Sequence, residues 1–307
     1  MFRQRHRSGD ARADRRAEYA EDYAQAGDVQ AAIELMRQAL ELTPGWPLGR
    51  LRLGEYLERA GQPDAAATLY RDLSAEGDDD VYGAGLKLAA LGRAPVPDSP
   101  PPAFVANLFD QYADRFETAL VQRLSYGVPG LIAQLLEGPG DLGAVLDLGC
   151  GTGLMGEQVR ARASRLDGLD LSDRMLSHAR QKRIYDTLYH ADLCAPPAEV
   201  LARRYDLVTA ADVLIYIGDL APVLRTVASV MAPAGRFAFS VEAGQPGTGY
   251  SLDQTLRYAH APDYVEAALS QAGFDLIEAK EAVLRRDRGE DVAGVLHLCA
   301  SRAKPQH

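Results

Sequence analysis

The fold of this chain is decided by the stretch Val145-Leu-Asp-Leu-Gly-Cys-Gly-Thr-Gly-Leu-Met-Gly156. It starts as an apolar run that is broken only by Asp147, and it then passes through three alternate glycines, Gly149, Gly151 and Gly153. This pattern predicts a buried parallel strand that ends in a glycine turn and leads into a helix. Glycines let a backbone approach a ligand closely, and a helix start offers unpaired N–H groups, so we predict a site for a nucleotide-like ligand.

Strand and helix patterns alternate on both sides of this stretch. We predict strands near 144–149, 166–170, 186–190, 205–211, 235–242, 274–283 and 292–300. We predict helices between them near 153–162, 173–182, 196–203, 219–230 and 261–272. The alternation is typical of an α/β domain with a doubly wound, Rossmann-like sheet, here of seven strands. Only the polar loop 285–291 separates the last two strands, which predicts a hairpin with an antiparallel strand at the edge.

The N-terminal part of the chain repeats itself. Gly27 recurs as Gly61 and Met36 as Tyr70, a period of 34 residues. Each unit has the pattern of two short amphipathic helices around a glycine turn, which predicts a small all-α domain over 16–93. The period and the alternation of small and large residues resemble the tetratricopeptide repeat, a module that usually binds a protein or peptide. Packing on the neighbouring domain or self-association would explain the repeats equally well.

The sequence predicts four segments. They are a basic, disordered tail over 1–15, the helical repeats over 16–93, a proline-rich linker over 94–102 and a second domain over 103–307. The linker has five prolines in nine residues, which excludes helix and inner strand. The second domain begins with a helical pattern over 104–124, in which Phe109, Tyr112 and Phe116 are three or four residues apart.

Composition excludes several classes of function. The net charge of −10 argues against nucleic-acid binding as the main task. Cys150, Cys194 and Cys299 have neither metal-ligand spacing nor the pattern of a disulfide framework, so we expect no metal and a reducing, cytoplasmic location. No run approaches the ~18 apolar residues of a membrane span, and we expect no membrane contact.

Three aspartates lie at or near the carboxyl ends of successive predicted strands. Asp147 lies in the first strand, where a buried carboxylate must be hydrogen-bonded, either to loop amides or to a ligand cation. Asp170 ends the next strand, where the doubly wound fold places an acceptor for both ribose hydroxyls. Asp192 follows the third strand, where it could accept from an adenine amino group. These spacings predict a cofactor that contains adenosine.

Together these pieces resemble the class I S-adenosylmethionine-dependent methyltransferases. The matching motifs are Val-Leu-Asp-Leu-Gly-Cys-Gly-Thr-Gly, Gly-Leu-Asp-Leu-Ser-Asp-Arg-Met-Leu, His-Ala-Asp-Leu and Tyr-Asp-Leu-Val-Thr-Ala-Ala-Asp-Val-Leu, within residues 140–300. The resemblance implies S-adenosylmethionine as cofactor, and the edge hairpin and Asp147 disfavour a nicotinamide oxidoreductase. It implies a cofactor-binding set of Asp147, Gly149, Gly151, Gly153, Asp170, Leu171, Asp192, Leu193, Ala211 and Tyr112.

The resemblance also gives these residues separate tasks. Gly149 and Gly151 would lie under the methionyl and ribose parts, and Asp170 would hold the ribose hydroxyls. Asp192 with Leu193 would hold the adenine, and Ala211 would lie near the methionyl amino group. The wider arrangement, with repeats before the domain and an aromatic helix at its start, looks like a bacterial group of repeat-containing methyltransferases. In related enzymes such a helix covers the cofactor, which makes Tyr112 and Phe116 candidates for a lid.

Methyl transfer requires an acceptor held in line with the methyl group, and often a base. We expect the acceptor side to include Asp212, Glu242 and Arg257, and we predict His260, Tyr258 and Tyr216 as catalytic residues. His260 titrates in a useful range, and its segment, 244–261, is too polar and glycine-rich for a core. The motif after the fourth strand lacks the Asn-Pro-Pro-Tyr pattern of many N-methyltransferases, which favours a small molecule methylated on oxygen or sulfur.

Two functions of different classes remain open on sequence alone. The first is an active methyltransferase for a small molecule. The second is an interaction protein whose repeats recruit a partner. It would either methylate this partner or bind the cofactor without catalysis. The cofactor motifs are intact, and this favours the enzyme.

Overall fold

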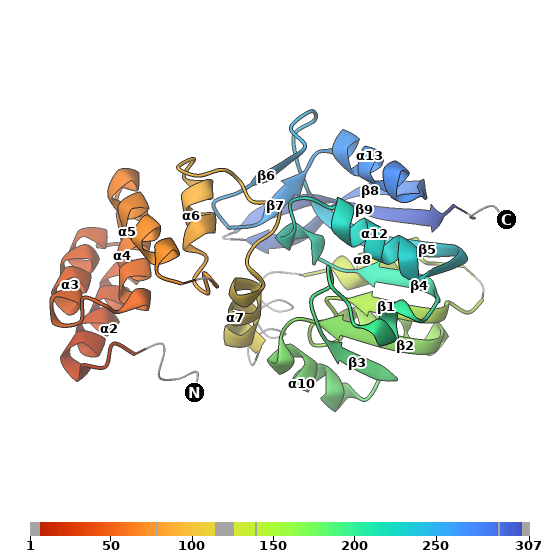
Figure 1. The fold of residues 1–307 in the computed structure, drawn as a ribbon, viewed down its shortest axis with the longest axis horizontal. Coiled ribbons are helices and arrows are strands. Elements are labelled where there is room, and N and C mark those ends of the chain that lie inside the picture. Colours follow the sequence, from red (N-terminus) through yellow and green to blue (C-terminus); the bar gives the residue numbers. More distant parts are fainter. Residues whose placement is uncertain (1–6, 78, 114–125, 139, 288, 303–307) are drawn as a thin grey trace. The chain divides into compact units, whose positions relative to one another are not determined.

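The structure is a computed structural model, and it describes residues 7–77, 79–113, 126–138, 140–287 and 289–302 (Figure 1). The chain divides into two compact units, Met1–Pro97 and Asp98–His307. The division falls inside 94–102, and we propose that this proline-rich stretch is the linker between two domains. Among the helices of the described residues, none combines the length and the apolar character needed to cross a membrane.

The first unit is built from helices that pack in antiparallel pairs. They are α2 (Ala11–Gln25), α3 (Val29–Leu42), α4 (Pro47–Arg59), α5 (Pro63–Ala75) and α6 (Ala84–Ala90). The repeated glycines Gly27 and Gly61 have φ angles of 91° and 72°, a left-handed turn that glycine adopts without a steric penalty. The repeated alanines Ala32 and Ala66 are fully buried, and their small side chains let the paired helices approach closely. The predicted all-α repeat domain is therefore confirmed.

The start of the first unit differs from the sequence prediction. Residues 1–6 lie outside the described residues, but α2 begins at Ala11, inside the stretch predicted to be disordered. Asp10 caps this helix, because its Oδ1 accepts hydrogen bonds from the backbone N–H groups of Arg12 at 2.7 Å and Ala13 at 3.3 Å. Ala13 is fully buried. The prediction was wrong here because it weighed the charge of the arginines and missed the cap.

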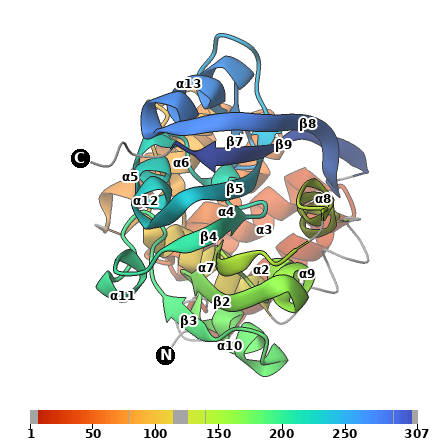
Figure 2. The ribbon, with the colours of Figure 1, turned by 90° about the vertical axis from the view of Figure 1, so that its right-hand side faces the viewer.

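The second unit contains the predicted doubly wound sheet. Its main strands are β1 (Gly143–Leu148), β2 (Ala163–Asp170), β3 (Thr187–His190), β4 (Tyr205–Ala210), β5 (Met231–Ala243), β8 (Phe274–Asp287) and β9 (Glu290–Ser301). Strands β3, β2, β1, β4 and β5 are neighbours in that order and run parallel. Strand β9 lies antiparallel between β5 and β8, as Figure 2 shows. The predicted fold class and its antiparallel strand near the edge are confirmed.

Two further short strands lie in the segment that was predicted to be a loop. They are β6 (Tyr250–Leu252) and β7 (Tyr258–His260), and they pair antiparallel with each other. Strand β7 also pairs with the end of β5, where Glu242 lies opposite Ala259. The described sheet therefore has nine strands instead of seven. Each added strand has only three residues and is flanked by polar or glycine-rich sequence, so it leaves no periodic signal.

Helices precede the sheet and alternate with its strands along the chain. They are α7 (Pro102–Tyr112), α8 (Val128–Leu135), α9 (Leu154–Val159), α10 (Asp173–Lys182), α11 (Ala198–Leu201), α12 (Ala221–Val230) and α13 (Pro262–Ala272), with short 3-10 helices at Arg160–Arg162 and Leu214–Tyr216. Residues of α12 and α13 form one apolar core with Leu146 and Leu148 of β1. Residues of α8 and α9 form another core with Val145 (Figure 2). Each large apolar side chain buried here contributes about 1.5–3 kcal/mol, which fixes the strand ends in place.

Candidate functional site

The glycine turn follows β1 directly. Gly149, Gly151 and Gly153 have φ angles of 61°, 54° and 96°, so the chain takes left-handed conformations at three alternate positions before α9. A Cβ atom on Gly149 would lie 2.5 Å from a side-chain carbon of Val213, in the loop after β4. Only glycine allows the two loops to lie this close. The turn thus presents bare backbone at the carboxyl edge of the sheet, as the sequence predicted.

Asp170 ties this turn to the next strand. Its Oδ2 accepts a hydrogen bond from the Gly151 N–H at 2.8 Å, and its Oδ1 accepts one from the Ser172 N–H at 2.8 Å. Burial raises the pKa of this carboxyl, and hydrogen bonds from the backbone of Ser172, Gly151 and Leu171 oppose that rise. The two carboxylate oxygens offer about four acceptor positions between them, so the side chain can still accept from a further donor.

Asp147 has a different place from the one predicted. Its carboxylate is almost fully buried, and it accepts from the Tyr185 hydroxyl at 2.7 Å and the Thr209 hydroxyl at 2.9 Å. Burial raises its pKa to about 6. We had predicted that this carboxylate contacts the cofactor, and that loop amides or a ligand cation compensate its charge. In the structure, the hydroxyls of Tyr185 and Thr209 donate hydrogen bonds to it instead. Asp147 lies beneath the turn and holds β1, β4 and the chain before β3 together.

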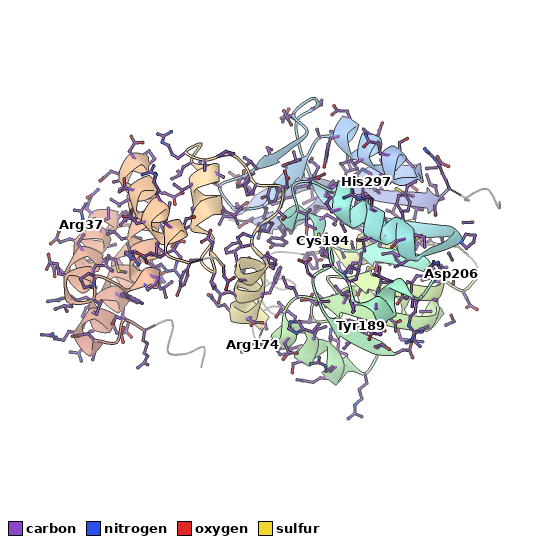
Figure 3. The ribbon with its side chains drawn as sticks, in the orientation of Figure 1. Arg37, Arg174, Tyr189, Cys194, Asp206 and His297 are labelled. Carbon is purple, nitrogen blue, oxygen red and sulfur yellow. The ribbon has the colours of Figure 1, made fainter. Side chains whose placement is uncertain are left out.

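The remaining predicted cofactor residues gather at the carboxyl ends of β2, β3 and β4. Asp192 accepts from the Cys194 N–H at 2.8 Å, which shapes the loop after β3. Figure 3 labels Cys194 in this loop and Tyr189 in β3. The Leu171 carbonyl contacts the His190 ring nitrogen at 2.9 Å, so the ends of β2 and β3 are joined. Leu193 and Ala211 are partly buried against the two apolar cores. The structure brings these residues to one edge, and their binding roles stay predictions.

Helix α7 connects two of these loops. Asp110 accepts a hydrogen bond from the Ser172 hydroxyl at 2.6 Å, next to Asp170. On the same helix, the Phe109 ring meets the Tyr216 ring edge-on, with centroids 5.2 Å apart. The helix was predicted over 104–124, and it is described over Pro102–Tyr112. The Tyr112 side chain and Phe116 lie outside the described part of the structure, so the lid stays a prediction.

Two of the three predicted catalytic residues are buried in the structure. His260 is 1% exposed, and its Nε2 donates to the carbonyls of Ile217 at 2.9 Å and Gly218 at 3.2 Å. Burial lowers its pKa to about 4, which keeps the ring neutral. Tyr258 is also fully buried. Both predictions were wrong because β7 builds their segment into the sheet, where it supports the loop after β4.

Tyr216, the third predicted catalytic residue, stays at the edge of the site. It is partly exposed and lies between Phe109 and Arg257, whose guanidinium is within hydrogen-bonding reach of its hydroxyl. Burial raises the pKa of this hydroxyl, so it is protonated at neutral pH. Tyr216 can therefore orient an acceptor by donating or accepting a hydrogen bond.

An ionic cluster that the sequence did not predict lies at the carboxyl ends of β4 and β5. The Arg285 side chain is 1% exposed, and its Nη1 donates to both carboxylate oxygens of Asp212 at 2.8 Å. Its Nη2 donates to Oε1 of Glu242. We had placed Arg285 in an exposed hairpin loop, but β8 extends past it, and an irregularity between Val283 and Arg285 turns the side chain inward.

The comparisons with known proteins agree with this geometry. A family model described as a methyltransferase domain matches residues 146–237, and one described as a tetratricopeptide repeat matches residues 23–90. The chain is 30% identical over 149 residues to a ubiquinone biosynthesis O-methyltransferase of Bordetella bronchiseptica, covering 43% of this chain and 61% of the relative. It is 31% identical over 178 residues to a malonyl-[acyl-carrier protein] O-methyltransferase of Erwinia pyrifoliae, covering 54% and 67%.

A solved structure is also similar. Magnesium protoporphyrin IX methyltransferase from Synechocystis, with bound SAH, matches with a TM-score of 0.49 and 19% identity over 65% of this chain and 99% of that one. The fold and the sequence motifs define a class I S-adenosylmethionine-dependent methyltransferase domain. The chain belongs to this family, and it carries tetratricopeptide repeats ahead of the domain. It spans about three fifths of the length of the first curated relatives.

Proposed function

We propose that this chain transfers the methyl group of S-adenosylmethionine to an oxygen atom of a small molecule. The observation that carries the proposal is the hydrogen bond from the Gly151 N–H to Asp170. It places a carboxylate, which can accept further hydrogen bonds, beside a glycine backbone that a ligand can approach closely. Two relatives whose names specify O-methyl transfer support oxygen over sulfur as the accepting atom. The three cysteines are free thiols, which fits the reducing cytoplasm that we propose as its location.

The chemistry of the site's residues fits S-adenosylmethionine. The close contact of Gly149 with Val213 leaves no room for a Cβ at the turn, so the backbone is free to lie under a ligand. Asp170 would accept from the ribose hydroxyls, Asp192 and Leu193 would contact the adenine, and the Ala211 carbonyl would accept from the methionyl amino group. When bound, the cofactor supplies an electrophilic methyl group on a sulfonium. The chain's own task is to orient this ligand and to exclude water.

A labelling experiment tests this proposal. The protein is incubated with S-adenosylmethionine that carries a carbon-13 methyl group, together with a bacterial extract separated into small molecules and proteins. We expect the label in the small-molecule fraction, with the chemical shift of an O-methyl group, and no transfer by the Asp170→Ala variant. Label on sulfur would contradict the accepting atom, and no label in either fraction would contradict methyl transfer itself.

The same experiment covers a second candidate function. The tetratricopeptide match over residues 23–90 supports a role in protein binding, so the repeats could deliver a protein as the methyl acceptor. In that case the label would appear in the protein fraction. Deleting the repeats would then abolish the transfer, whereas a small-molecule acceptor would still be methylated.

A further inference from the structure

Of the two carboxylates on the acceptor side, Glu242 has an oxygen that is available to accept a hydrogen bond from a substrate. It is the penultimate residue of β5, and its side chain is 13% exposed. Its Oε1 accepts from Arg285, whereas its Oε2 has no hydrogen-bond partner within the described part of the chain. Asp212 differs, because both of its oxygens accept from the same Arg285 nitrogen. Of the two carboxylates, Glu242 therefore has the freer oxygen.

The cations around Glu242 are already paired. Arg285 is shared between Asp212 and Glu242, so this trio has an excess of one negative charge. Arg257 donates to Asp287 at 2.9 Å and lies within hydrogen-bonding reach of Tyr216. An acceptor that is itself an anion would meet the excess carboxylate charge of this trio. The charge pattern favours an acceptor that arrives neutral.

The cluster also shows signs of a binding site. Arg285 is buried, yet its Nε finds no acceptor among the described residues. Asp212 has a φ angle of 59°, a left-handed conformation that is uncommon for residues other than glycine, and the Ser240 hydroxyl holds its N–H at 2.9 Å. Such backbone geometry is kept where the surrounding structure needs one orientation of a side chain. The rings of Phe109 and Tyr216 give the same region an aromatic wall.

We propose that Glu242 is the general base of this enzyme, and that its acceptor is a neutral hydroxyl on an aromatic ring. This inference rests on the proposed function. A lone pair of the acceptor oxygen forms the bond to the methyl carbon, and the carbon–sulfur bond breaks with its electron pair left on sulfur. The hydroxyl proton moves to Oε2 of Glu242 and then to water. Arg285 and Asp212 are positioning residues, because they act through Glu242.

The electrostatic surroundings suit a base. Burial raises the pKa of Glu242, and the charges of Arg285 and Arg257 oppose the rise, whereas the charge of Asp212 adds to it. A base with a raised pKa takes a proton more readily, and it loses activity as the pH falls through that value. His260 does not compete for this role, because its side chain is buried and its lowered pKa makes it a weak base.

The test compares wild type with Glu242→Gln on three probes, phenol, 4-nitrophenol and benzoate, at a pH where only phenol keeps its proton. We expect wild type to methylate phenol and to leave benzoate unreacted. Wild type should methylate ionised 4-nitrophenol more slowly than phenol, because that acceptor is an anion. The variant should lose about 100-fold in kcat on phenol but less than about 10-fold on ionised 4-nitrophenol, because that acceptor needs no base. KM and the Kd for S-adenosylmethionine should stay unchanged, which a purely structural defect would not allow.

Controls separate this inference from the function on which it rests. Glu278→Gln, on the exposed part of β8, should behave as wild type. Glu242→Asp keeps a carboxylate but withdraws it by one methylene, so it should retain more activity on phenol than Glu242→Gln, and a larger loss on phenol than on 4-nitrophenol remains informative if the glutamine variant does not fold. An equal loss in Glu242→Gln on both phenols, a preference for benzoate, or no turnover of any probe despite cofactor binding would overturn the inference alone. Failure to bind S-adenosylmethionine would overturn the proposed function with it.

Discussion

Replacing Asp170 with alanine is expected to raise the Kd for S-adenosylmethionine about 100-fold. The substitution removes a charged acceptor from two ribose hydroxyls, and hydrogen bonds to a charged group contribute about 1.5–3 kcal/mol each. It also frees the N–H groups of Gly151 and Ser172, which the carboxylate now holds at 2.8 Å. The glycine turn would lose its anchor to β2, and preorganisation of the site would fall with it.

Isothermal titration calorimetry measures this effect directly. The matched control is Asp173→Ala, because Asp173 lies in the first turn of α10, three residues further on, with its side chain 67% exposed and paired with Arg180. We expect the control to bind as wild type. Equal affinity of the Asp170→Ala variant and wild type would mean that the ribose lies elsewhere.

Replacing Arg285 with methionine is expected to destabilise the methyltransferase domain by about 3–5 kcal/mol. The guanidinium is almost fully buried between Asp212 and Glu242, and its loss would leave two carboxylates close together without a cation. Removing one partner of a buried ionic cluster costs more than removing all of it, because the remaining charges stay desolvated. Replacing Asp212 with asparagine and Glu242 with glutamine in the same chain should therefore recover most of the lost stability.

Urea unfolding can separate the two domains. The single tryptophan, Trp46, lies in the repeat unit, so its fluorescence should report on the repeats and stay unchanged in the variant. Far-UV circular dichroism should show the sheet unfolding at a lower urea concentration. The control is Arg286→Met, whose ion pair with Asp291 is more than half exposed and should contribute less than about 1 kcal/mol. Equal midpoints for the Arg285 and Arg286 variants would contradict a buried role for Arg285.

Much of the fold could be predicted because its signals are local. The apolar run before Gly149 is a pattern of adjacent residues, and each helical repeat is a pattern within one short unit. The structure confirms the elements that these patterns predict. The position of Asp170 could also be predicted, because the carboxyl ends of parallel strands meet at one edge. The two short strands β6 and β7 could not, since pairing of β7 with the end of β5, and of β6 with β7, stabilises them more than their own sequence does.

The parts of the site that were missed depend on contacts between distant segments. Thr209 and Tyr185 satisfy Asp147 from β4 and from the chain before β3, and nothing in the local sequence marks them as its partners. Arg285 looked like a polar loop residue until the long β8–β9 hairpin turned it inward. His260 was predicted to be accessible because its neighbours in the sequence are polar, whereas its segment forms a buried strand.

The central claim is that the glycine turn and Asp170 bind a sulfonium cofactor and not a dinucleotide. The most direct measurement is a calorimetric titration of the full chain with S-adenosylmethionine, with its demethylated product and with NAD. We predict that the first two bind with one equivalent per chain and that NAD gives no heat of binding. Binding of NAD with no binding of S-adenosylmethionine would contradict the account.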